Sequence, residues 1–303
     1  MSQAESTRDQ APETNAWNAQ RRLVVGGVAL IALAIAIYAS ILYHMVLFWH
    51  SSDDYSHGFL IVPLALFFAY ERKYDLAAAR IEGSWWGVVP LTLASLALAI
   101  GRLGVELMAM RTSFVLTLIG IVLLVFGRRI FRILLFPLLF LFLMVPLPQS
   151  LLNVVAFPLQ LMAARMAEDA LHFLAIPALV EGNIIHLANA ELFVAEACSG
   201  LRSVMALLTL GVVMAKFFQR GAVARLLLVA STIPIAILVN AIRVTLTGIL
   251  THHYGQEAAH GTIHDFQGLI TFGVAFLILM LEARTIDWVR SLRRPLRAGG
   301  GDA

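Results

Sequence analysis

Charged residues are scarce in this chain of 303 residues. They make up 14% of it, whereas a soluble domain averages about 25%, and hydrophobic residues reach 60%. The apolar residues form long runs separated by short charged breaks, and a run of about 20 of them can cross the hydrocarbon core of a bilayer. One such run could be a buried helix, but this many cannot. The composition therefore excludes an ordinary soluble protein and predicts the lipid bilayer as a partner.

Cysteine is rarer still, because Cys198 is the only one. A single cysteine cannot form a disulfide within the chain, so it is structural, modified or reactive. No secretory signal-peptide pattern precedes the first apolar run. We expect a disordered cytoplasmic tail over residues 1–22, a membrane domain over residues 23–283 and a basic cytoplasmic tail over residues 284–303.

The apolar runs predict an all-α integral membrane protein with about eight transmembrane helices. Residues 150–175 are apolar on one side only, which is typical of an amphipathic helix at the membrane surface, here on the extracytoplasmic side. Residues 178–197 contain Gly, Asn and alternating apolar residues, which favours a short β-hairpin between the fifth and sixth spans. The predicted spans cover residues 23–47, 57–71, 86–101, 107–127, 131–147, 200–218, 223–247 and 266–283.

The basic residues indicate the orientation, because cytoplasmic loops of membrane proteins are rich in Lys and Arg. With the N-terminus inside, both termini are cytoplasmic and 17 of the 22 basic residues fall in cytoplasmic segments. The five others are Arg102, Arg111, Arg165, Arg202 and Arg243. All nine histidines fall on the outer side with Cys198. This bias indicates membrane topology, not a nucleic-acid surface, and predicts that any chemistry faces outward.

The first candidate segment, residues 196–203, places Cys198 at the outer start of the sixth predicted span. The thiolate is the reactive form of cysteine, and its pKa falls near a helix N-terminus and near cations. Ser199 or Ser203 could cap this helix, and Arg202 follows one turn on. A lone cysteine in a span is otherwise usually a small buried apolar residue. Its serine and arginine neighbours favour a reactive thiol.

The second segment contains Asn240 and Arg243, near the outer end of the seventh predicted span. An arginine at membrane depth is costly and marks a functional site by default. It could fix a carboxylate or stabilise a developing oxyanion. The alternative is an arginine that snorkels to the interface. Asn240, one turn earlier, favours a polar seam.

The third segment, residues 261–268, enters the eighth predicted span and contains His264. Histidine is the residue best suited to proton transfer near neutral pH. Asp265 follows it directly and so points elsewhere on a helix. The alternative is a helix N-cap region with an interfacial histidine. His57, in the segment that leads into the second span, either lines the same outer cavity or belongs to a solvated loop.

Cys198, Arg243 and His264 thus fall at the outer ends of three consecutive spans, where short connections favour neighbouring helices. A nucleophile, an electrophilic stabiliser and a base are the parts of covalent acyl transfer. The spacing of His252 and His253 does not suit one metal on one helix, so we expect no metal and no cofactor.

Two other classes of protein stay open. A multi-pass transporter could use Arg243 and the histidines as a substrate or proton path, although the two halves of the chain do not resemble each other. A non-catalytic membrane partner of polysaccharide export or haem machinery could use His44, His57 and His264. Dependence on the thiol separates acyl transfer from both.

Four motifs resemble those of the exosortases, bacterial multi-pass membrane cysteine transpeptidases related to archaeosortases. They are the segments Ala197–Ser203, Asn240–Val244, Ser56–Gly58, and His264 with Gly268. The similarity extends over roughly residues 40–283. Archaeosortase-type members carry arginine at the position of His264, so the chain resembles the bacterial type, without a fused C-terminal domain.

The resemblance implies a membrane peptidase or transpeptidase, in the bacterial inner membrane, with its active site facing the periplasm. Its partners would be exported proteins with a C-terminal sorting signal of the PEP-CTERM kind, which ends in a transmembrane helix. Cys198 would be the nucleophile, His264 the general acid/base and Arg243 the oxyanion stabiliser or a substrate clamp. Arg202 could share or replace the role of Arg243. The acyl group would pass to an unknown acceptor, polysaccharide- or lipid-linked. Supporting or substrate-binding positions would be Arg202, Asn240, His57, Ser199 and Asp265.

Overall fold

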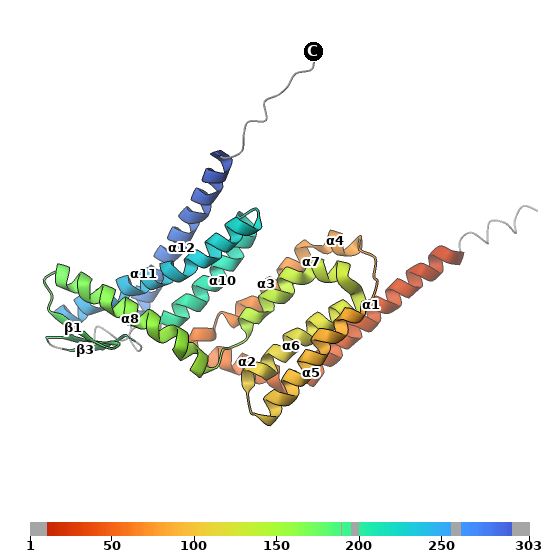
Figure 1. Cartoon of the computed structure of the whole chain (residues 1–303), viewed down its shortest axis with the longest axis horizontal. Coiled ribbons are helices and arrows are strands. Elements are labelled where there is room, and N and C mark those ends of the chain that lie inside the picture. Colours follow the sequence, from red (N-terminus) through yellow and green to blue (C-terminus); the bar gives the residue numbers. More distant parts are fainter. Residues whose placement is uncertain (1–10, 189, 195–199, 256–261, 293–303) are drawn as a thin grey trace, which may run out of the picture. The chain divides into compact units, whose positions relative to one another are not determined.

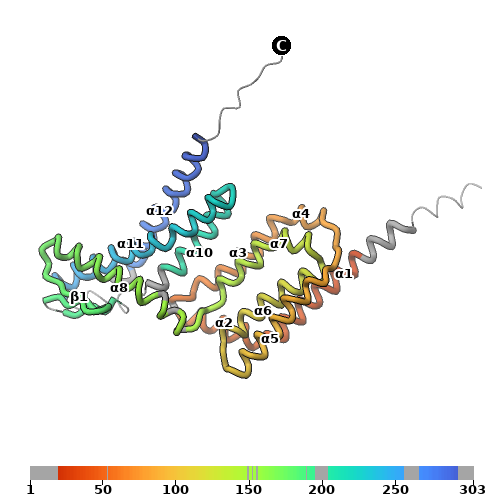
Figure 2. Tube along the Cα trace, in the orientation of Figure 1, coloured from red at the N-terminus to blue at the C-terminus, as the bar shows by residue number. Residues whose placement is uncertain are grey.

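The computed structural model describes residues 11–188, 190–194, 200–255 and 262–292 (Figure 1). These residues form two compact units, one up to Pro148 and the other from Gln149. Both units are helical, as the sequence predicts, and the Cα trace in Figure 2 shows the course of the chain within each of them.

The described residues of the first unit form helices and connecting loops, without a strand. Its long helices pack in neighbouring pairs: α1 with α6, α5 with α6, and α3 with α7. Phe68 of α3 contacts Phe136 and Phe140 of α7, with ring centroids 5.0 and 5.5 Å apart. The elements are α1 (Ala11–Ile37), α2 (Ala39–Ser51), η1 (Asp53–Tyr55), α3 (Gly58–Glu71), α4 (Lys73–Ala77), η2 (Trp85–Gly87), α5 (Val88–Leu103), α6 (Leu107–Ile121), η3 (Val122–Phe126), α7 (Gly127–Phe140) and η4 (Leu141–Met144).

Where it is described, the second unit combines four helices with a small sheet. Helices α10, α11 and α12 pack on one another, while α8 packs on α11 and against the sheet. Strands β1, β2 and β3 pair antiparallel in that order, one strand more than a hairpin. The elements are α8 (Gln149–Phe173), β1 (Ala178–Glu181), β2 (Ile184–Leu187), β3 (Glu191–Phe193), α10 (Gly200–Phe218), α11 (Ala222–Tyr254) and α12 (Thr262–Leu292).

Helix α8 occupies the segment with one-sided apolar character. Ala164, Ala167 and Leu171 are fully buried on the side that faces the sheet and α11. Glu168 is half-buried, and its Oε1 accepts a hydrogen bond of 2.9 Å from the backbone N–H of Val180 in β1. This contact joins α8 to the sheet, and α8 also packs on α11.

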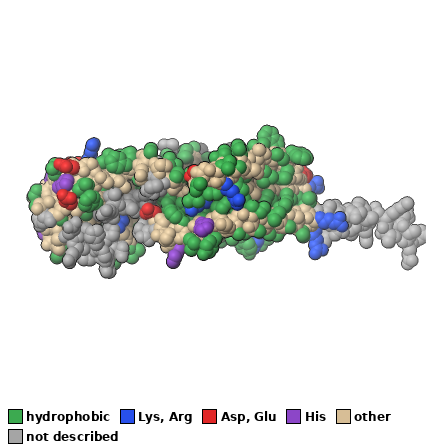
Figure 3. All heavy atoms as spheres, turned by 90° about the horizontal axis from the view of Figure 1, so that it is seen from below, with side chains coloured by type: hydrophobic (Ala, Val, Ile, Leu, Met, Phe, Trp, Pro, Cys, Tyr) green, Lys and Arg blue, Asp and Glu red, His purple; other side chains and the backbone are tan. Residues whose placement is uncertain are grey.

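Among the described residues, five helical segments are long and apolar enough to cross a membrane. They are Gln20–Ile37, Trp85–Leu103, Leu107–Met144, Ala222–Tyr254 and Phe266–Leu292, and two shorter apolar helices cover Gly58–Glu71 and Val204–Phe218. Large areas of hydrophobic side chains cover the face seen in Figure 3, as lipid contact requires.

The predicted count of eight spans exceeds these five. The segment Leu107–Met144 has 38 residues, which at helical rise is about 57 Å, roughly twice the thickness of the hydrocarbon core. Gly127 interrupts it with φ +84°, a conformation outside the helical region. Two crossings in this segment, together with the two shorter helices, would give eight, so that count stays a prediction.

Both ends of the predicted membrane domain lie inside helices. Helix α1 begins at Ala11, so residues 11–22, for which the sequence predicts disorder, continue the first helix. Helix α12 continues to Leu292, nine residues beyond the predicted end at residue 283. A helix can project past the hydrocarbon region without a change in its hydrogen bonding, whereas the predicted boundaries follow hydropathy alone.

Candidate functional site

The predicted site residues are distributed over α10, α11, α12 and the turn before α3. Cys198 and Ser199 lie outside the described residues. Arg202 is in the first turn of α10, and His264 and Asp265 are in the first turn of α12. Arg243 and Asn240 lie on α11 and are buried.

A polar seam runs along one face of α11. Asn240, Arg243, Thr247 and Thr251 follow one another at intervals of three or four residues, which is the helical repeat, and all four are buried. Side chains at this spacing line one side of a helix, so the sequence places a continuous polar stripe inside an otherwise apolar bundle. We call these four residues, with Gln267 and Thr271 of α12, the polar seam.

The guanidinium of Arg243 lies against α12 at Gly268. A Cβ atom placed on Gly268 would be 3.5 Å from Nη2 and 3.7 Å from Cζ of Arg243. Arg243 is only 9% exposed, so its charge is held within the protein and not at the lipid boundary. This position disagrees with a snorkelling arginine and agrees with the predicted polar seam.

Gln267 joins the two helices of the seam. The hydroxyl of Thr247 lies 3.0 Å from Oε1 of Gln267 and 2.9 Å from the carbonyl oxygen of Arg243, and it donates to both in a three-centre bond. Nε2 of Gln267 is buried without a hydrogen-bond partner among the described residues, and so is Oδ1 of Asn240. A buried donor and a buried acceptor beside a guanidinium are groups that a bound peptide backbone would satisfy.

On α12, His264 is one helical turn before Gly268, the residue at which Arg243 contacts this helix. Residues four apart lie on the same side of a helix, about 6 Å along its axis. The backbone of α12 therefore brings the position of His264 close to that of Arg243. Since Cys198 lies outside the described residues, Arg243 and His264 are the one pair of predicted catalytic residues whose backbone positions can be compared.

Hydrogen bonds also join α12 to α11 and to the residue after α10, at the ends of these helices farther from His264. Gln219, almost fully buried, donates from Nε2 to the carbonyl oxygen of Ala283 over 2.8 Å. Ser231 of α11 donates to Oε2 of Glu282 over 2.6 Å. These bonds fix α12 against its neighbours at the opposite end of the helices from the seam. The register between Arg243 and Gly268 therefore has support at both ends.

His57 belongs to the first unit, directly before α3. The Trp49 ring packs where a Cβ of Gly58 would be, and its Nε1 donates to the carbonyl oxygen of Met144 over 3.1 Å. Tyr55 stacks obliquely on His57, with 5.8 Å between ring centroids, and its hydroxyl accepts a bond from the backbone N–H of Leu147. Burial raises the pKa of this hydroxyl. His57 thus lies in a tightly packed turn, where only glycine fits at position 58 because a side chain would overlap the Trp49 ring.

Among the described residues, no group of three or more His, Cys, Asp and Glu side chains could hold a metal ion. His252 and His253 pack edge to face on α11, with ring centroids 5.1 Å apart.

Four members of the seam were not predicted from the sequence: Thr247, Thr251, Gln267 and Thr271. Thr247 and Thr271 can satisfy their own hydroxyls on the preceding helical turn, as many threonines in membrane helices do, so their sequence positions carry little signal. The signal that could have found Thr247 was its spacing of four from Arg243.

These features define a polytopic helical membrane protein with a buried arginine at the contact of two adjacent helices. The family model for transmembrane exosortases matches residues 49–281, and the chain therefore belongs to the transmembrane exosortase family. The match includes the polar seam and all three predicted catalytic residues. No curated protein matches the chain. No solved structure matches it either.

Proposed function

We propose that this exosortase is a cysteine peptidase or transpeptidase that acts on exported proteins at the periplasmic face of the bacterial inner membrane. Its substrates would carry a C-terminal sorting signal of the PEP-CTERM kind that ends in a transmembrane helix. The observation that carries the proposal is the buried guanidinium of Arg243 against Gly268, one turn from His264. Family membership supports the reaction class.

In the first half-reaction, His264 accepts the proton of the Cys198 thiol. The sulfur attacks the carbonyl carbon of the scissile peptide bond, and the guanidinium of Arg243 stabilises the negative charge that develops on the carbonyl oxygen. His264 then returns the proton to the leaving nitrogen as the C–N bond breaks. The products are a thioester on Cys198 and a released transmembrane helix with a new amino terminus.

In the second half-reaction, an acceptor nucleophile attacks the thioester and gives its proton to His264. The C–S bond breaks, and the proton passes to the sulfur, which restores the thiol. Water as the nucleophile gives hydrolysis, and a polysaccharide- or lipid-linked group gives transfer. Gln267 and Asn240 would hold the backbone of the substrate through their buried carboxamides.

The test is processing of a tagged sorting-signal substrate in cells that express the wild type, Cys198→Ala or Cys198→Ser at matched membrane levels. We expect the wild type to release the C-terminal helix, seen as a gel shift, and both variants to leave the substrate intact. Mass spectrometry of the new C-terminus distinguishes hydrolysis from transfer. Hydroxylamine added to the wild type would capture the thioester as a hydroxamate.

If the wild type and both variants trimmed the substrate equally, the result would contradict the thiol mechanism. A transporter or a non-catalytic partner of polysaccharide export would then account better for the polar seam. Arg102→Ala serves as the control for general effects of losing a basic residue, because Arg102 is exposed at the end of α5.

A further inference from the structure

A basic hollow of about 850 Å³ lies in the first unit, on the side that the charge bias assigns to the cytoplasm. Four arginines and two carboxylates line it: Arg80, Arg128, Arg129, Arg132, Asp75 and Glu82. Asp75 also forms an ion pair of 3.1 Å with Arg72, outside the hollow, which reduces its effect on the four guanidinium groups. The hollow therefore has an excess of positive charge and favours an anion.

The backbone holds these arginines in place. The N–H of Ser84 lies 3.2 Å from the carbonyl oxygen of Leu123 and 3.1 Å from that of Leu124, which joins the loop after α4 to η3. Gly127, with φ +84°, lies so close to Glu82 that a Cβ would overlap the carbonyl oxygen of Glu82. The loop that carries Arg80 and the first turn of α7 are thus fixed side by side. The backbone of the site is therefore fixed before an anion binds, and the exposed arginine side chains become ordered on binding.

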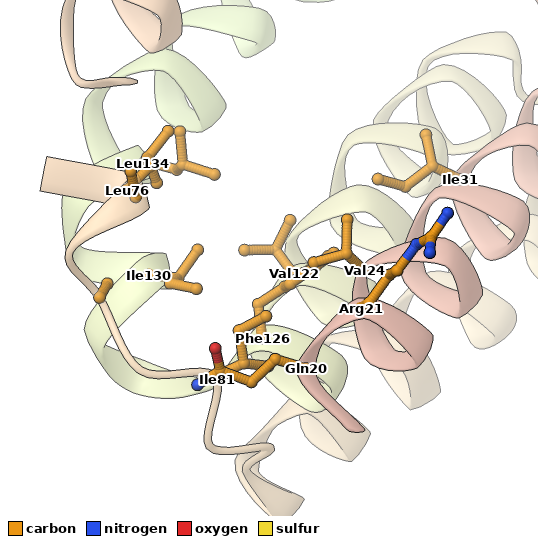
Figure 4. A pocket seen from close by; sticks show the side chains of 12 residues that line it. Gln20, Arg21, Val24, Ile31, Leu76, Ile81, Val122, Phe126, Ile130 and Leu134 are labelled. Atoms are coloured by element: carbon orange, nitrogen blue, oxygen red, sulfur yellow. The ribbon is translucent and has the colours of Figure 1, made fainter. Parts of the chain in front are cut away.

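An apolar hollow of about 530 Å³ adjoins the basic one (Figure 4). Phe126 lines both hollows. Asp75 of α4 lines the basic hollow, and the next residue, Leu76, lines the apolar one. The side chains around the apolar hollow are mostly aliphatic and come from α1, α4, η3, α7 and the loop before η2. They include Val24, Ile31, Val122, Ile130 and Leu134. A basic hollow beside an aliphatic one matches an amphiphile with a phosphate at one end and a hydrocarbon chain at the other.

We propose that these two hollows form a binding site for one anionic phospholipid, with its phosphate on the arginines and an acyl chain in the apolar hollow. Basic pockets between membrane helices on the cytoplasmic side bind anionic head groups, and guanidinium forks match phosphate oxygens in pairs. A zwitterionic lipid would bring its own cation into the arginine cluster and lose affinity. The aliphatic hollow disfavours an acidic protein segment, whose charged side chains would be desolvated there.

Native mass spectrometry of the full chain in detergent tests this site with two lipids of equal chain length, phosphatidylglycerol and phosphatidylcholine. We expect the wild type to retain phosphatidylglycerol about tenfold more strongly. The variant Arg128→Gln/Arg129→Gln/Arg132→Gln loses this preference. The control Arg22→Gln/Arg102→Gln/Arg284→Gln removes three exposed charges elsewhere and keeps it.

A second variant tests the acyl chain. Ile130→Trp fills the apolar hollow and weakens binding of a long-chain phosphatidylglycerol while binding of a six-carbon-chain analogue stays unchanged. Equal retention of both lipids by the wild type, or the same preference in both triple variants, would overturn the proposal. Displacement of the lipid by millimolar inorganic phosphate would also overturn it, because the hollow would then be a site for free phosphate. The measurement does not involve peptide cleavage, so its failure is separate from failure of the proposed function.

Discussion

The guanidinium of Arg243 is buried against Gly268 of α12, and the same face of α11 carries the buried side chains of Asn240 and Thr247. In such an environment a fixed cation stabilises a developing negative charge more strongly than it could in water, because the surroundings screen it poorly. This single side chain carries most of the electrostatic part of the proposed site. Its substitution should therefore affect the chemical step more than binding.

We expect Arg243→Ala to lower kcat/KM for substrate processing about 10²- to 10³-fold, the usual cost of one oxyanion donor. Arg243→Lys should recover part of the loss, because it restores the charge without the planar fork. Initial rates with purified protein in vesicles measure both, with Arg102→Ala as the control. Full activity in Arg243→Ala, together with loss in Arg202→Ala, would transfer the oxyanion role to Arg202.

Gln267 provides a second test at the level of single residues. Gln267→Ala removes the buried carboxamide, and Thr247→Val removes the hydroxyl that orients it. We expect about tenfold lower kcat/KM from the first change and a smaller loss from the second. Since both act through one carboxamide, the double variant should be no worse than Gln267→Ala alone. Additive losses would mean that Thr247 acts independently of Gln267.

At the scale of the element, α12 must approach α11 closely at Gly268. A Cβ there would touch the Arg243 guanidinium at ordinary van der Waals distance, whereas a longer side chain would displace it. We expect Gly268→Ala to keep most of the activity and Gly268→Leu to lose at least about 100-fold, comparable to loss of an oxyanion donor.

Gly273 on the same helix gives the matched control, because no atom of the described residues lies within 4 Å of the point that its Cβ would occupy. Gly273→Leu should therefore retain activity. An equal loss in Gly268→Leu and Gly273→Leu would show that α12 tolerates no bulk anywhere, and the specific contact with Arg243 would lose its support.

The close contact of η2 with η3 leads to a prediction about stability. A Cβ on Gly87 would overlap the backbone of Leu124, and a Cβ on Gly127 would overlap the backbone of Glu82. Gly87→Ala should lower the melting temperature of the purified protein by several degrees, because the added Cβ would overlap the Leu124 backbone, which cannot move aside as a flexible side chain could. Gly26→Ala on α1 is the control, since its position is open, and it should leave the melting temperature unchanged or slightly raised. If the wild type, Gly87→Ala and Gly26→Ala had the same melting temperature, that result would contradict the close contact of η2 with η3.

At the scale of the whole molecule, the orientation in the membrane decides whether the site faces outward. Gly182, in the turn between β1 and β2, has open space around it and suits insertion of a short reporter. We expect a periplasm-dependent reporter to be active at this turn and inactive at either terminus. A cytoplasm-dependent reporter should give the opposite pattern. Activity of the periplasmic reporter at the C-terminus would make the number of spans odd and refute the predicted eight.

Hydropathy found the helices because a bilayer imposes a simple length and composition on them. Every predicted span overlaps helical residues, although the first is divided between α1 and α2 and the number of spans stays a prediction, and the amphipathic segment overlaps α8. The helix ends were less well predicted, as α1 and α12 show. Hydropathy marks where the lipid ends, whereas hydrogen bonding marks where the helix ends.

The sequence by itself determined the class of protein, the family motifs and the presence of an arginine at membrane depth, since composition and local spacing are sufficient for each of them. Only the tertiary structure decided that Arg243 faces Gly268 of α12 and that Gln267 joins Thr247. It also decided that Arg80 shares one hollow, beside an apolar one, with three arginines of α7 that are distant from it in the chain. These features depend on the register between helices, which results from packing and close backbone approach, and no local pattern of residues encodes that register.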